Sequence, residues 1–401
     1  MSFGQEHRAP SGRVVVRAIT DIDRIRELSA DERRMLKQVI SKYPFRVNSY
    51  YLSLIDWADP ADPLRRLVIP HELELTRWGQ LDACNEQAVT VCPGVQHKYG
   101  STVLILLTDM CACFCRYCFR KRIFQPEHYT PRFNPEQALE YIREHPEVNN
   151  VLLTGGDPLV LSTARLRTVI RALREIEHVR IIRIGTKIPA FNPYRIIYDQ
   201  DLLKLFRQNS LPNKRIYMIC HFDHPHELTP ASRRAIALLQ DANVVCLNQS
   251  PIIRGVSDDP AVLSRLWNEL SFLGVSQYYI FQGRPTSGNK IYNLPLTEAY
   301  GIIEQARSGC SGLAKRTRFV MSHASGKIEI IGLDDKYIYL KYHRAQAKED
   351  NQRFMKYYRD DGAVWLDELV PADRLDKSPV SEFSLITLRN PDDDIYAGLW
   401  Q

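Results

Sequence analysis

From about residue 102 onward, short runs of β-branched and other apolar residues alternate with amphipathic segments of helical periodicity. The expected strands are 102–108, 150–154, 179–185, 215–221, 243–248 and 277–282. The expected helices include 135–144, 163–176, 230–240, 260–273 and 296–306. Near-continuous apolar strands separated by helices are typical of a parallel sheet that is buried on both faces. The pattern therefore predicts an α/β fold, an incomplete (β/α)6 barrel.

The segments on either side of this core have different patterns. Residues 1–95 are expected to form a helical N-terminal extension, in which Ser29 and Glu32 make a capping box before a helical apolar pattern that stops at Pro44. We expect the barrel core to span 96–312, and a small β segment with strands at 318–322, 327–331 and 337–342 to span 313–345. Residues 346–401 are expected to be a C-terminal tail that contains a charged helix.

The loop after the first expected strand holds a dense group of cysteines, Cys111, Cys113, Cys115 and Cys118. Three of them, Cys111, Cys115 and Cys118, have the spacing Cys-x3-Cys-x2-Cys. A short loop with this spacing can wrap one face of an iron–sulfur cube, whose usual protein ligands are thiolates. Three ligands leave one iron open to bind and reduce a small molecule. Cys113 has no place in this pattern and is expected to be a packed or spare thiol.

Two other uses of these cysteines are less consistent with the sequence. A structural zinc site usually draws its ligands from two clusters set well apart, and this octet is too cramped for a good tetrahedron. Disulfides need an oxidising compartment, whereas the segment from Met1 to Arg8 has no apolar signal region. Reduced cysteines and the absence of such a signal predict a cytoplasmic protein.

Polar motifs follow other strands of the expected barrel. Gly155-Gly156-Asp157 comes directly after the second strand, and His221 ends the fourth. Ligands bind at the carboxyl ends of the strands in this architecture, so we expect these residues and the cysteine loop to share one pocket. His224 and His226 follow His221 with irregular spacing, which favours a pocket role for His221 over a zinc site.

The net charge of +6 is mild, and the basic residues are dispersed except beside the cysteines, at Arg116, Arg120, Lys121 and Arg122. That group is suited to an anionic ligand. The composition gives no indication of nucleic-acid binding, and no apolar run approaches the roughly 18 residues of a membrane span. We expect a small-molecule substrate, and a homo-oligomer remains open.

Taken together, these motifs resemble the radical S-adenosylmethionine (SAM) superfamily, and most closely its lysine 2,3-aminomutase family. The resemblance runs from about residue 20 to about 345 and is carried by the segments 107–111, 115–120, 153–159, 183–186, 221–225, 248–250, 254–256 and 278–280. It implies a partial TIM-like barrel of the radical SAM type with a [4Fe–4S] cluster that reductively cleaves S-adenosylmethionine. It also implies an isomerase that uses pyridoxal 5'-phosphate to move an amino group from C2 to C3, and an electron donor such as flavodoxin or ferredoxin.

The resemblance implies roles for particular residues. Gly155, Gly156 and Asp157 match the SAM-binding motif, in which glycines let the backbone approach the methionine part closely. Lys327 stands in the place of the lysine that binds pyridoxal phosphate, although the glycine run before it is shorter and mostly replaced. The other positions that match neighbours of pyridoxal phosphate are Lys98, Tyr99 and Gln249.

Arg120 matches the arginine that binds the α-carboxylate of the substrate, and a planar guanidinium suits a carboxylate fork. Lysine-specific members place two aspartates around the distal ammonium, where Arg284 and Ser322 stand here. Burying an ammonium against Arg284 without a carboxylate is unfavourable by several kcal/mol. We therefore predict an aminomutase whose substrate is not free lysine, with a glutamate-like amino acid as the first candidate.

Other functions remain open from the sequence alone. The same cluster and radical would also serve an epimerase, a dehydratase or a deaminase without the same role for pyridoxal phosphate. A protein-bound lysine is a further substrate class, as in the translation-factor modification carried out by relatives. In a different class of protein, the cysteines would hold zinc in a structural adaptor.

Overall fold

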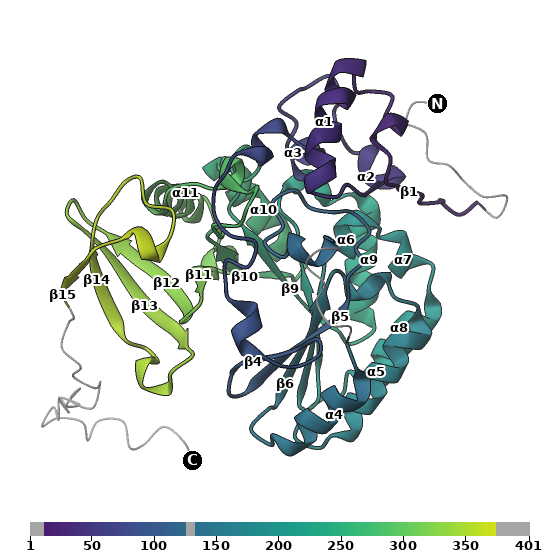
Figure 1. Cartoon of the computed structure of the whole chain (residues 1–401). Helices are drawn as coiled ribbons and strands as arrows, with labels where there is room; N and C mark the ends of the chain where they lie inside the picture. The colour runs from purple at the N-terminus through teal and green to yellow at the C-terminus, as the bar shows by residue number, and fades with distance from the viewer. Residues whose placement is uncertain (1–11, 126–132, 374–401) are drawn as a thin grey trace, which may run out of the picture.

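The computed structural model describes residues 12–125 and 133–373. A long sheet dominates it, with its strands hydrogen-bonded in the order β15-β14-β13-β12-β11-β10-β9-β8-β7-β6-β5-β4-β3 (Figure 1). The strands that run parallel are β5 (Thr102–Thr108), β6 (Asn150–Gly155), β7 (Ile181–Thr186), β8 (Ile216–Cys220), β9 (Val245–Pro251), β10 (Ser276–Phe281) and β11 (Arg318–His323). Within the described residues β3 and β15 do not pair, which confirms an incomplete barrel.

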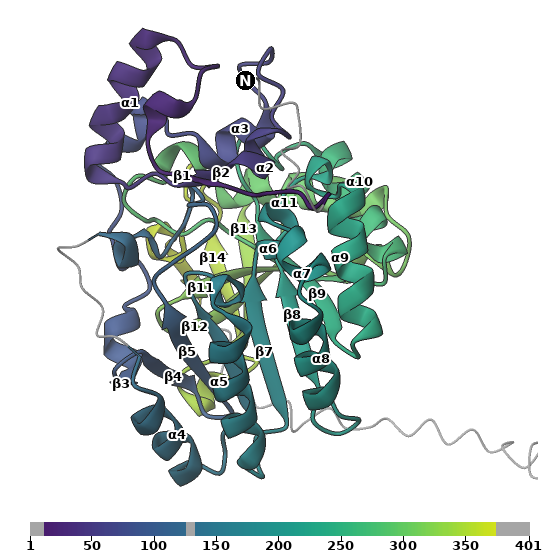
Figure 2. The same ribbon diagram turned by 90° about the vertical axis from the view of Figure 1, so that its right-hand side faces the viewer.

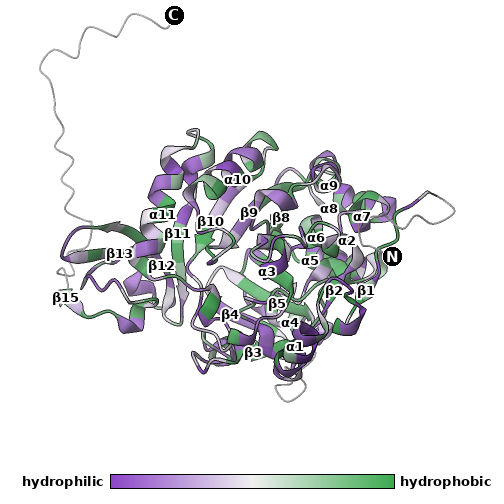
Figure 3. Cartoon of the chain, turned by 90° about the horizontal axis from the view of Figure 1, so that it is seen from above, coloured by the Kyte–Doolittle hydropathy of each residue, from purple (hydrophilic) through white to green (hydrophobic). Residues whose placement is uncertain are grey.

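A helix follows each parallel strand from β5 to β10, as the alternating pattern predicts. The longer helices of this layer are α4 (Pro135–Glu144), α5 (Thr163–Glu175), α8 (Gln200–Asn209), α9 (Pro230–Asp241), α10 (Pro260–Phe272) and α11 (Leu296–Ser308), with the short α6 (Ile188–Phe191) and α7 (Tyr194–Ile197) before α8. Figure 2 shows α5, α8 and α9 along the outer side of the strands. In Figure 3, helices such as α10 carry both purple and green residues, as amphipathic helices should.

The strands alternate in burial, which differs from the expectation of strands buried equally on both faces. In β7, Ile182 and Ile184 are fully buried against the helices, whereas Arg183 and Gly185 face the interior of the barrel. Side chains alternate between the two faces of a strand. A hollow, polar interior therefore explains why apolar strands contain residues such as Arg183.

An antiparallel extension adds strands to both ends of the parallel sheet. On the side of β5 it consists of β4 (Val95–Tyr99) and β3 (Thr90–Cys92). On the side of β11 it consists of β12 (Gly326–Leu333), β13 (Tyr337–Ala345), β14 (Phe354–Tyr358) and β15 (Pro371–Asp373). The sheet thus continues past residue 345, and the charged helix expected there is wrong for 346–373. The segment Phe354–Tyr358 forms the strand β14 in spite of its charged flanks, because its backbone pairs with β13.

The N-terminal region forms a cap at the carboxyl ends of the parallel strands. It contains α1 (Ala30–Lys42), α2 (Ser49–Leu52) and α3 (Pro63–Val68), with β1 (Ala18–Ile19) paired to β2 (Val47–Asn48). The capping box predicted at Ser29 and Glu32 is present and starts α1. A separate apolar core holds the cap together. Among the helices of the described ranges, none is both long and apolar enough to cross a bilayer.

Candidate active site

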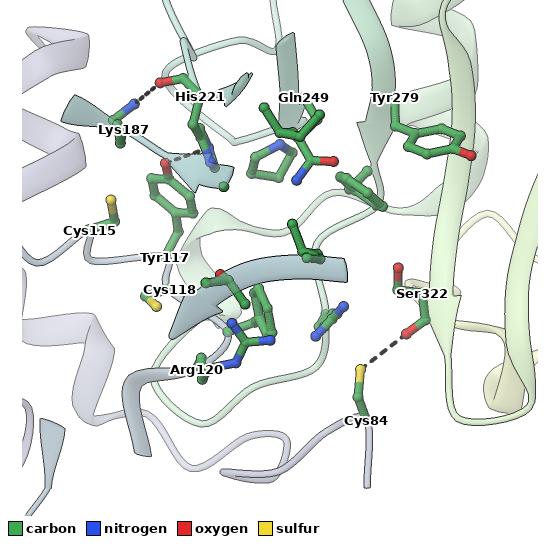
Figure 4. A pocket seen from close by; sticks show the side chains of 18 of the residues that line it. Cys84, Cys115, Tyr117, Cys118, Arg120, Lys187, His221, Gln249, Tyr279 and Ser322 are labelled. Atoms are coloured by element: carbon green, nitrogen blue, oxygen red, sulfur yellow. Dashed lines mark hydrogen bonds between the residues drawn. The ribbon is translucent and has the colours of Figure 1, made fainter. Parts of the chain in front are cut away.

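The cap and the strand ends enclose a pocket of about 400 Å³. Residues from distant parts of the chain line it, and every residue that the sequence analysis assigns to a site is among them: Cys111, Cys115, Cys118, Gly155, Gly156, Asp157, Lys98, Tyr99, Gln249, Lys327, Arg120, Arg284 and Ser322. Figure 4 shows Cys115 and Cys118 on one side of the pocket and Tyr279 and Ser322 on the other. The pocket therefore has one side formed by the thiols and another formed by β10 and β11, the last two parallel strands.

The cysteine loop is held by backbone hydrogen bonds to the cap. Phe114 N donates to Arg46 O at 2.8 Å, and Arg116 N donates to Leu67 O at 2.9 Å. Burial, followed by Asp157 and the neighbouring thiols, raises the pKa of the Cys111 thiol well above its usual range. Metal binding by such thiols must therefore release their protons.

Cys113 also borders the pocket, but it is the buried cysteine of this loop, whereas the three expected ligands are partly exposed. Its side chain is buried in the apolar core of the cap, and its sulfur accepts a hydrogen bond from Asn48 Nδ2 at 3.3 Å. The same Asn48 amide donates to Phe191 O at 2.9 Å. Cys113 is thus placed to anchor the loop to the cap, which agrees with its expected role as a packed thiol.

The glycine pair after β6 permits a close approach between two loops. Gly155 has φ +121°, and a Cβ atom there would lie 2.3 Å from Thr108 O. A Cβ atom at Gly156 would lie 2.2 Å from Met110 O. Gly156 N donates to Thr108 O at 2.6 Å. The glycines are therefore needed to pack the start of the cysteine loop against β6, whatever they contribute to a cofactor.

Asp157 binds donors of its own chain in the floor of the pocket. Its carboxylate accepts hydrogen bonds from Thr186 Oγ1 at 2.7 Å and from the backbone N of Lys187 at 2.8 Å and of Leu159 at 3.0 Å. Burial outweighs these hydrogen bonds and raises the pKa of Asp157. Asp157 therefore ties β6 to the end of β7, next to the thiol side.

A buried network with His221 at its edge lies beside the cysteine loop, and sequence reasoning found only its histidine. Lys187 Nζ lies 2.6 Å from Asp223 Oδ2 and 2.8 Å from Glu227 Oε1. His221 Nε2 lies 3.0 Å from Asp223 Oδ1 and 3.0 Å from the Tyr117 hydroxyl (Figure 4). Burial opposes the charged form, but His221 and Lys187 outweigh it and lower the pKa of Asp223. The signal for this network was the polar run 221–227 after an apolar strand.

Arg120 does not face the pocket as an unpaired cation. Its Nε and Nη2 lie 3.1 Å and 2.6 Å from Glu86 Oε1, and Arg122 Nη2 lies 2.6 Å from Glu86 Oε2. Burial opposes ionisation of Glu86, but Arg120, with Arg284 and Arg122 behind it, lowers its pKa to about 2. Glu86 is thus a buried carboxylate already occupied by two guanidinium groups. No local sequence signal identifies Glu86, because its two arginine partners are 34 and 36 residues away in the sequence.

Arg284 follows β10 and stacks on an aromatic ring. Its guanidinium carbon lies 3.7 Å from the centroid of the Phe119 ring. Its Nη1 is buried and makes no hydrogen bond with any described residue. Nearby, the Cys84 thiol donates to Ser322 O at 3.0 Å (Figure 4). An unsatisfied guanidinium nitrogen in the wall of a pocket is suited to an anionic group.

Lys327 is the second residue of β12, and its partly buried side chain lies among aromatic rings and cations. Its Nζ lies 4.0 Å from the centroid of the Tyr279 ring and 5.1 Å from that of Phe281. Burial, followed by Arg183, Arg344, Arg284 and Lys98, lowers the pKa of Lys327 well below its usual range. A lowered pKa increases the uncharged fraction of a lysine amine, and the uncharged amine is the form that attacks carbonyl groups.

Lys98, expected near pyridoxal phosphate, reaches the turn before Lys327. Its Nζ donates to His323 O at 2.5 Å, and burial lowers its pKa to about 8. Two further cations of the pocket wall, Arg183 and Arg344, were assigned no role from the sequence. A charged residue between Ile182 and Ile184 in an apolar strand was the available signal for Arg183.

Comparison with known proteins defines the class of this site. Residues 105–266 match the Radical SAM superfamily. A protein of Aquifex aeolicus (strain VF5), provisionally named L-lysine 2,3-aminomutase, is 48% identical over 351 residues, which are 87% of this chain and 94% of the relative. The L-lysine 2,3-aminomutase of Clostridium subterminale is 36% identical over 315 residues, 78% of this chain and 74% of the relative. The glutamate 2,3-aminomutase of Clostridioides difficile (strain 630) is 33% identical over 314 residues, 77% and 73% of the two chains.

The fold and site are therefore those of a radical SAM enzyme, with the thiol loop after the first parallel strand. The chain belongs to the lysine 2,3-aminomutase family of this superfamily. It is an isomerase, and the cofactors of the family are a [4Fe–4S] cluster, S-adenosylmethionine and pyridoxal phosphate. Membership in this family decides against the zinc-binding adaptor.

The residues present fit these cofactors. Cys111, Cys115 and Cys118 line the pocket from one loop, as ligands of different irons in one cube would. Lys327 offers a partly buried amine with a lowered pKa at the opposite side. The basic wall between them suits the carboxylate and phosphate groups that the cofactors carry.

Proposed function

We propose that this enzyme is an amino-acid 2,3-aminomutase whose substrate has an acidic side chain, with glutamate as the first candidate. The observation that carries the proposal is Arg284, a pocket-lining arginine that stacks on Phe119 and whose buried Nη1 has no hydrogen-bond partner among the described residues. A side-chain carboxylate would satisfy that nitrogen with a charge-assisted hydrogen bond. The side-chain ammonium of lysine would meet a like charge in a poorly screened site.

The charges of the whole pocket wall support the same choice. Among the described residues, the acidic ones that line it are Glu86 and Asp157, and the basic ones are Lys98, Arg120, Arg183, Lys187, Arg284, Lys327 and Arg344. Glu86 is occupied by Arg120 and Arg122, and Asp157 by backbone and hydroxyl donors. Neither is available to a substrate ammonium. The names of the relatives include both lysine and glutamate 2,3-aminomutases, so they favour neither substrate alone.

We assign the remaining roles by position. Cys111, Cys115 and Cys118 are the cluster ligands, and Lys327 attaches pyridoxal phosphate. The α-carboxylate of the substrate is assigned to Nη1 of Arg120, because Glu86 engages Nε and Nη2. When bound, the cluster and S-adenosylmethionine supply a radical and pyridoxal phosphate carries the migrating amine. The chain itself orients these groups and excludes water with the cap.

The test compares three amino acids with reduced, cofactor-loaded enzyme and detects β-amino acids by mass spectrometry. We expect conversion of L-glutamate, weaker conversion of its neutral analogue L-glutamine, and none of free L-lysine. Arg284→Gln should lower kcat/KM for glutamate by about 10- to 150-fold, the range for loss of a hydrogen bond to a charged group. Its effect on glutamine should be smaller, because that substrate offers no charge to Arg284.

Arg359→Gln is the matched control, since this arginine pairs with Asp361 away from the pocket. It should leave all three activities unchanged, because surface ion pairs contribute little. Conversion of free lysine to β-lysine by the unaltered enzyme at a rate comparable to that of glutamate would contradict the proposal. Turnover of a protein-bound lysine with none of the free amino acids would also contradict it.

A further inference from the structure

The far side of the pocket, around Lys327, gathers several cations, of which Arg284 and Lys98 have the carboxylate of Glu86 within electrostatic range. Arg183, Arg284, Arg344 and Lys98 all lie close enough to act on the Lys327 amine. Each of them lines the pocket. Like charges in a desolvated site repel one another strongly. This side of the pocket is therefore electrostatically incomplete without an anion.

Arg344 is placed beside Lys327 by the register of the sheet. The two residues are direct partners in the antiparallel pair of β12 and β13. Directly opposed side chains lie on the same face of a sheet, with Cβ atoms about 4.5–5.5 Å apart. The Arg344 guanidinium carbon lies 4.4 Å from the centroid of the Tyr99 ring. Both side chains therefore extend from neighbouring strands into the same part of the pocket.

The hydrogen bonds of Arg344 leave its charge uncompensated. Its Nη1 lies 3.3 Å from Thr102 Oγ1, and its Nη2 lies 3.1 Å from Ser101 Oγ. These partners are neutral hydroxyl groups at the start of β5. Within the described part of the chain, no carboxylate forms an ion pair with Arg344.

Arg183 reaches the same region from β7. It faces inward, and its Nε donates to the side-chain oxygen of Asn150 at 2.8 Å. Asn150 and Thr102, which binds Arg344, are direct partners at the starts of β6 and β5, so the two arginines bind neighbouring residues of the sheet. In agreement with this placement, burial lowers the pKa of Arg183, and Arg344 lowers it further, while Tyr278 and Tyr279 oppose that effect.

The other two cations have different partners. Lys98 donates to His323 O at 2.5 Å and holds the turn before Lys327. Arg284 stacks on Phe119, where the substrate side chain is assigned. Arg183 and Arg344 therefore remain as the pair with neutral partners and no assigned ligand.

We propose that Arg344 and Arg183 together bind the phosphate group of pyridoxal phosphate, while Lys327 holds the aldehyde end of the same molecule. A phosphate dianion accepts hydrogen bonds from two guanidinium forks and neutralises both charges. The inference rests on the proposed function, because it takes Lys327 as the attachment point. It adds two arginines to the residues that the sequence analysis placed beside pyridoxal phosphate, which were Lys98, Tyr99 and Gln249.

The test compares pyridoxal phosphate with pyridoxal, which has the same aldehyde and no phosphate. Both are titrated into the full-length, cluster-loaded protein and followed by absorbance, and attachment to Lys327 is located by borohydride reduction and peptide mapping. The unaltered protein should bind pyridoxal phosphate much more tightly than pyridoxal. Arg344→Gln and Arg183→Gln should each weaken pyridoxal phosphate by at least about 10-fold and leave pyridoxal nearly unchanged.

Pyridoxal binding doubles as a control for folding, since a variant that binds it normally has an intact pocket. Arg344→Lys should retain part of the preference for the phosphate, because a lysine keeps the charge and loses the fork. Arg359→Gln should retain all of it. If both glutamine variants keep the full preference while Lys327 still carries the label, the phosphate assignment is wrong and the function stands. If the unaltered protein attaches neither compound at Lys327, the proposed function and this inference both fail.

Discussion

At the scale of single residues, Glu86 compensates part of the positive charge in the wall of the pocket. Its carboxylate lies within 2.6 Å of nitrogens of both Arg120 and Arg122, and all three side chains are mostly buried. Removing one partner of a buried ion pair leaves an uncompensated charge and is destabilising by about 3–5 kcal/mol. Glu86 is therefore a structural counter-ion of the pocket, and its loss should affect stability before specificity.

We predict that Glu86→Gln lowers the free energy of unfolding at pH 7 by about 3–5 kcal/mol, measured by urea denaturation. The pKa of Glu86 is lowered from 4.5 to about 2, so its stabilisation is present above pH 4.5 and is lost as the pH falls toward 2. The difference between the variant and the unaltered protein should therefore shrink over that range.

Glu298→Gln is the matched control, because Glu298 also contacts an arginine, Arg254, at 2.6 Å, but on the surface. It should change the free energy of unfolding by no more than about 0.5 kcal/mol. Equal effects of the two substitutions, or a Glu86→Gln difference independent of pH, would show that burial does not govern this ion pair.

At the scale of elements, the cysteine loop serves two structures at once. All four cysteines of the loop line the pocket, and Cys113 is in addition buried in the core of the cap. The glycines after β6 let the loop begin directly against that strand. The loop is thus fixed on both sides, which should hold its thiols in place before a cluster is built.

Alanine substitutions in the loop should separate these two roles. We predict that Cys111→Ala, Cys115→Ala and Cys118→Ala each abolish the bound iron and acid-labile sulfide of anaerobically reconstituted protein. Cys113→Ala should keep the iron and instead lower stability by about 1 kcal/mol, because it removes one small buried group. Loss of iron from Cys113→Ala, together with retention by one of the other three, would refute the ligand assignment.

At the scale of the whole molecule, periodicity predicted the barrel because each strand and helix carries its own local pattern. The bounds of β5 and α4 agree with the sequence prediction, as does the capped start of α1. Helix α8 was not among the helices named from the sequence, because α6 and α7 interrupt the connection before it. A charged helix was expected within 346–401; its described part, 346–373, contains strands and two short 3-10 helices instead, since the pairing of β14 with β13 is a non-local contact.

The residues of the site could likewise be predicted only where a local sequence motif carries them. Residues carried by motifs, such as the cysteines and Lys327, were found and do line one pocket. Glu86 and Arg344 were not found, because their roles depend on the partners that the fold brings to them. Arg344 gains its position only through the register of β12 and β13. A single sequence does not specify that register, which is set by side chains and turns of both strands.

The cysteine loop also links the pocket to the N-terminal cap. Ala112, Cys113, Cys115 and Tyr117 pack with the apolar core of the cap, and the loop backbone donates to Arg46 O and Leu67 O. The sheet from β12 to β15 belongs to the other core, against which Ala112 is the one residue of the loop that packs among the described residues. A ligand that stabilises one conformation of the loop should therefore stabilise the cap more than this sheet.

We predict that reconstituting the cluster slows amide hydrogen exchange in α3 and around Arg46 by about 10-fold or more, equivalent to about 1.4 kcal/mol of local stability. Exchange in β13 and β14 should change much less, and it serves as the internal control. The experiment compares cluster-loaded and cluster-free protein by mass spectrometry under anaerobic conditions. Equal protection of the cap and of β13 would mean that the cluster stabilises the molecule globally. Unchanged exchange in α3 would mean that the cap does not sense the loop, despite the two hydrogen bonds that join them.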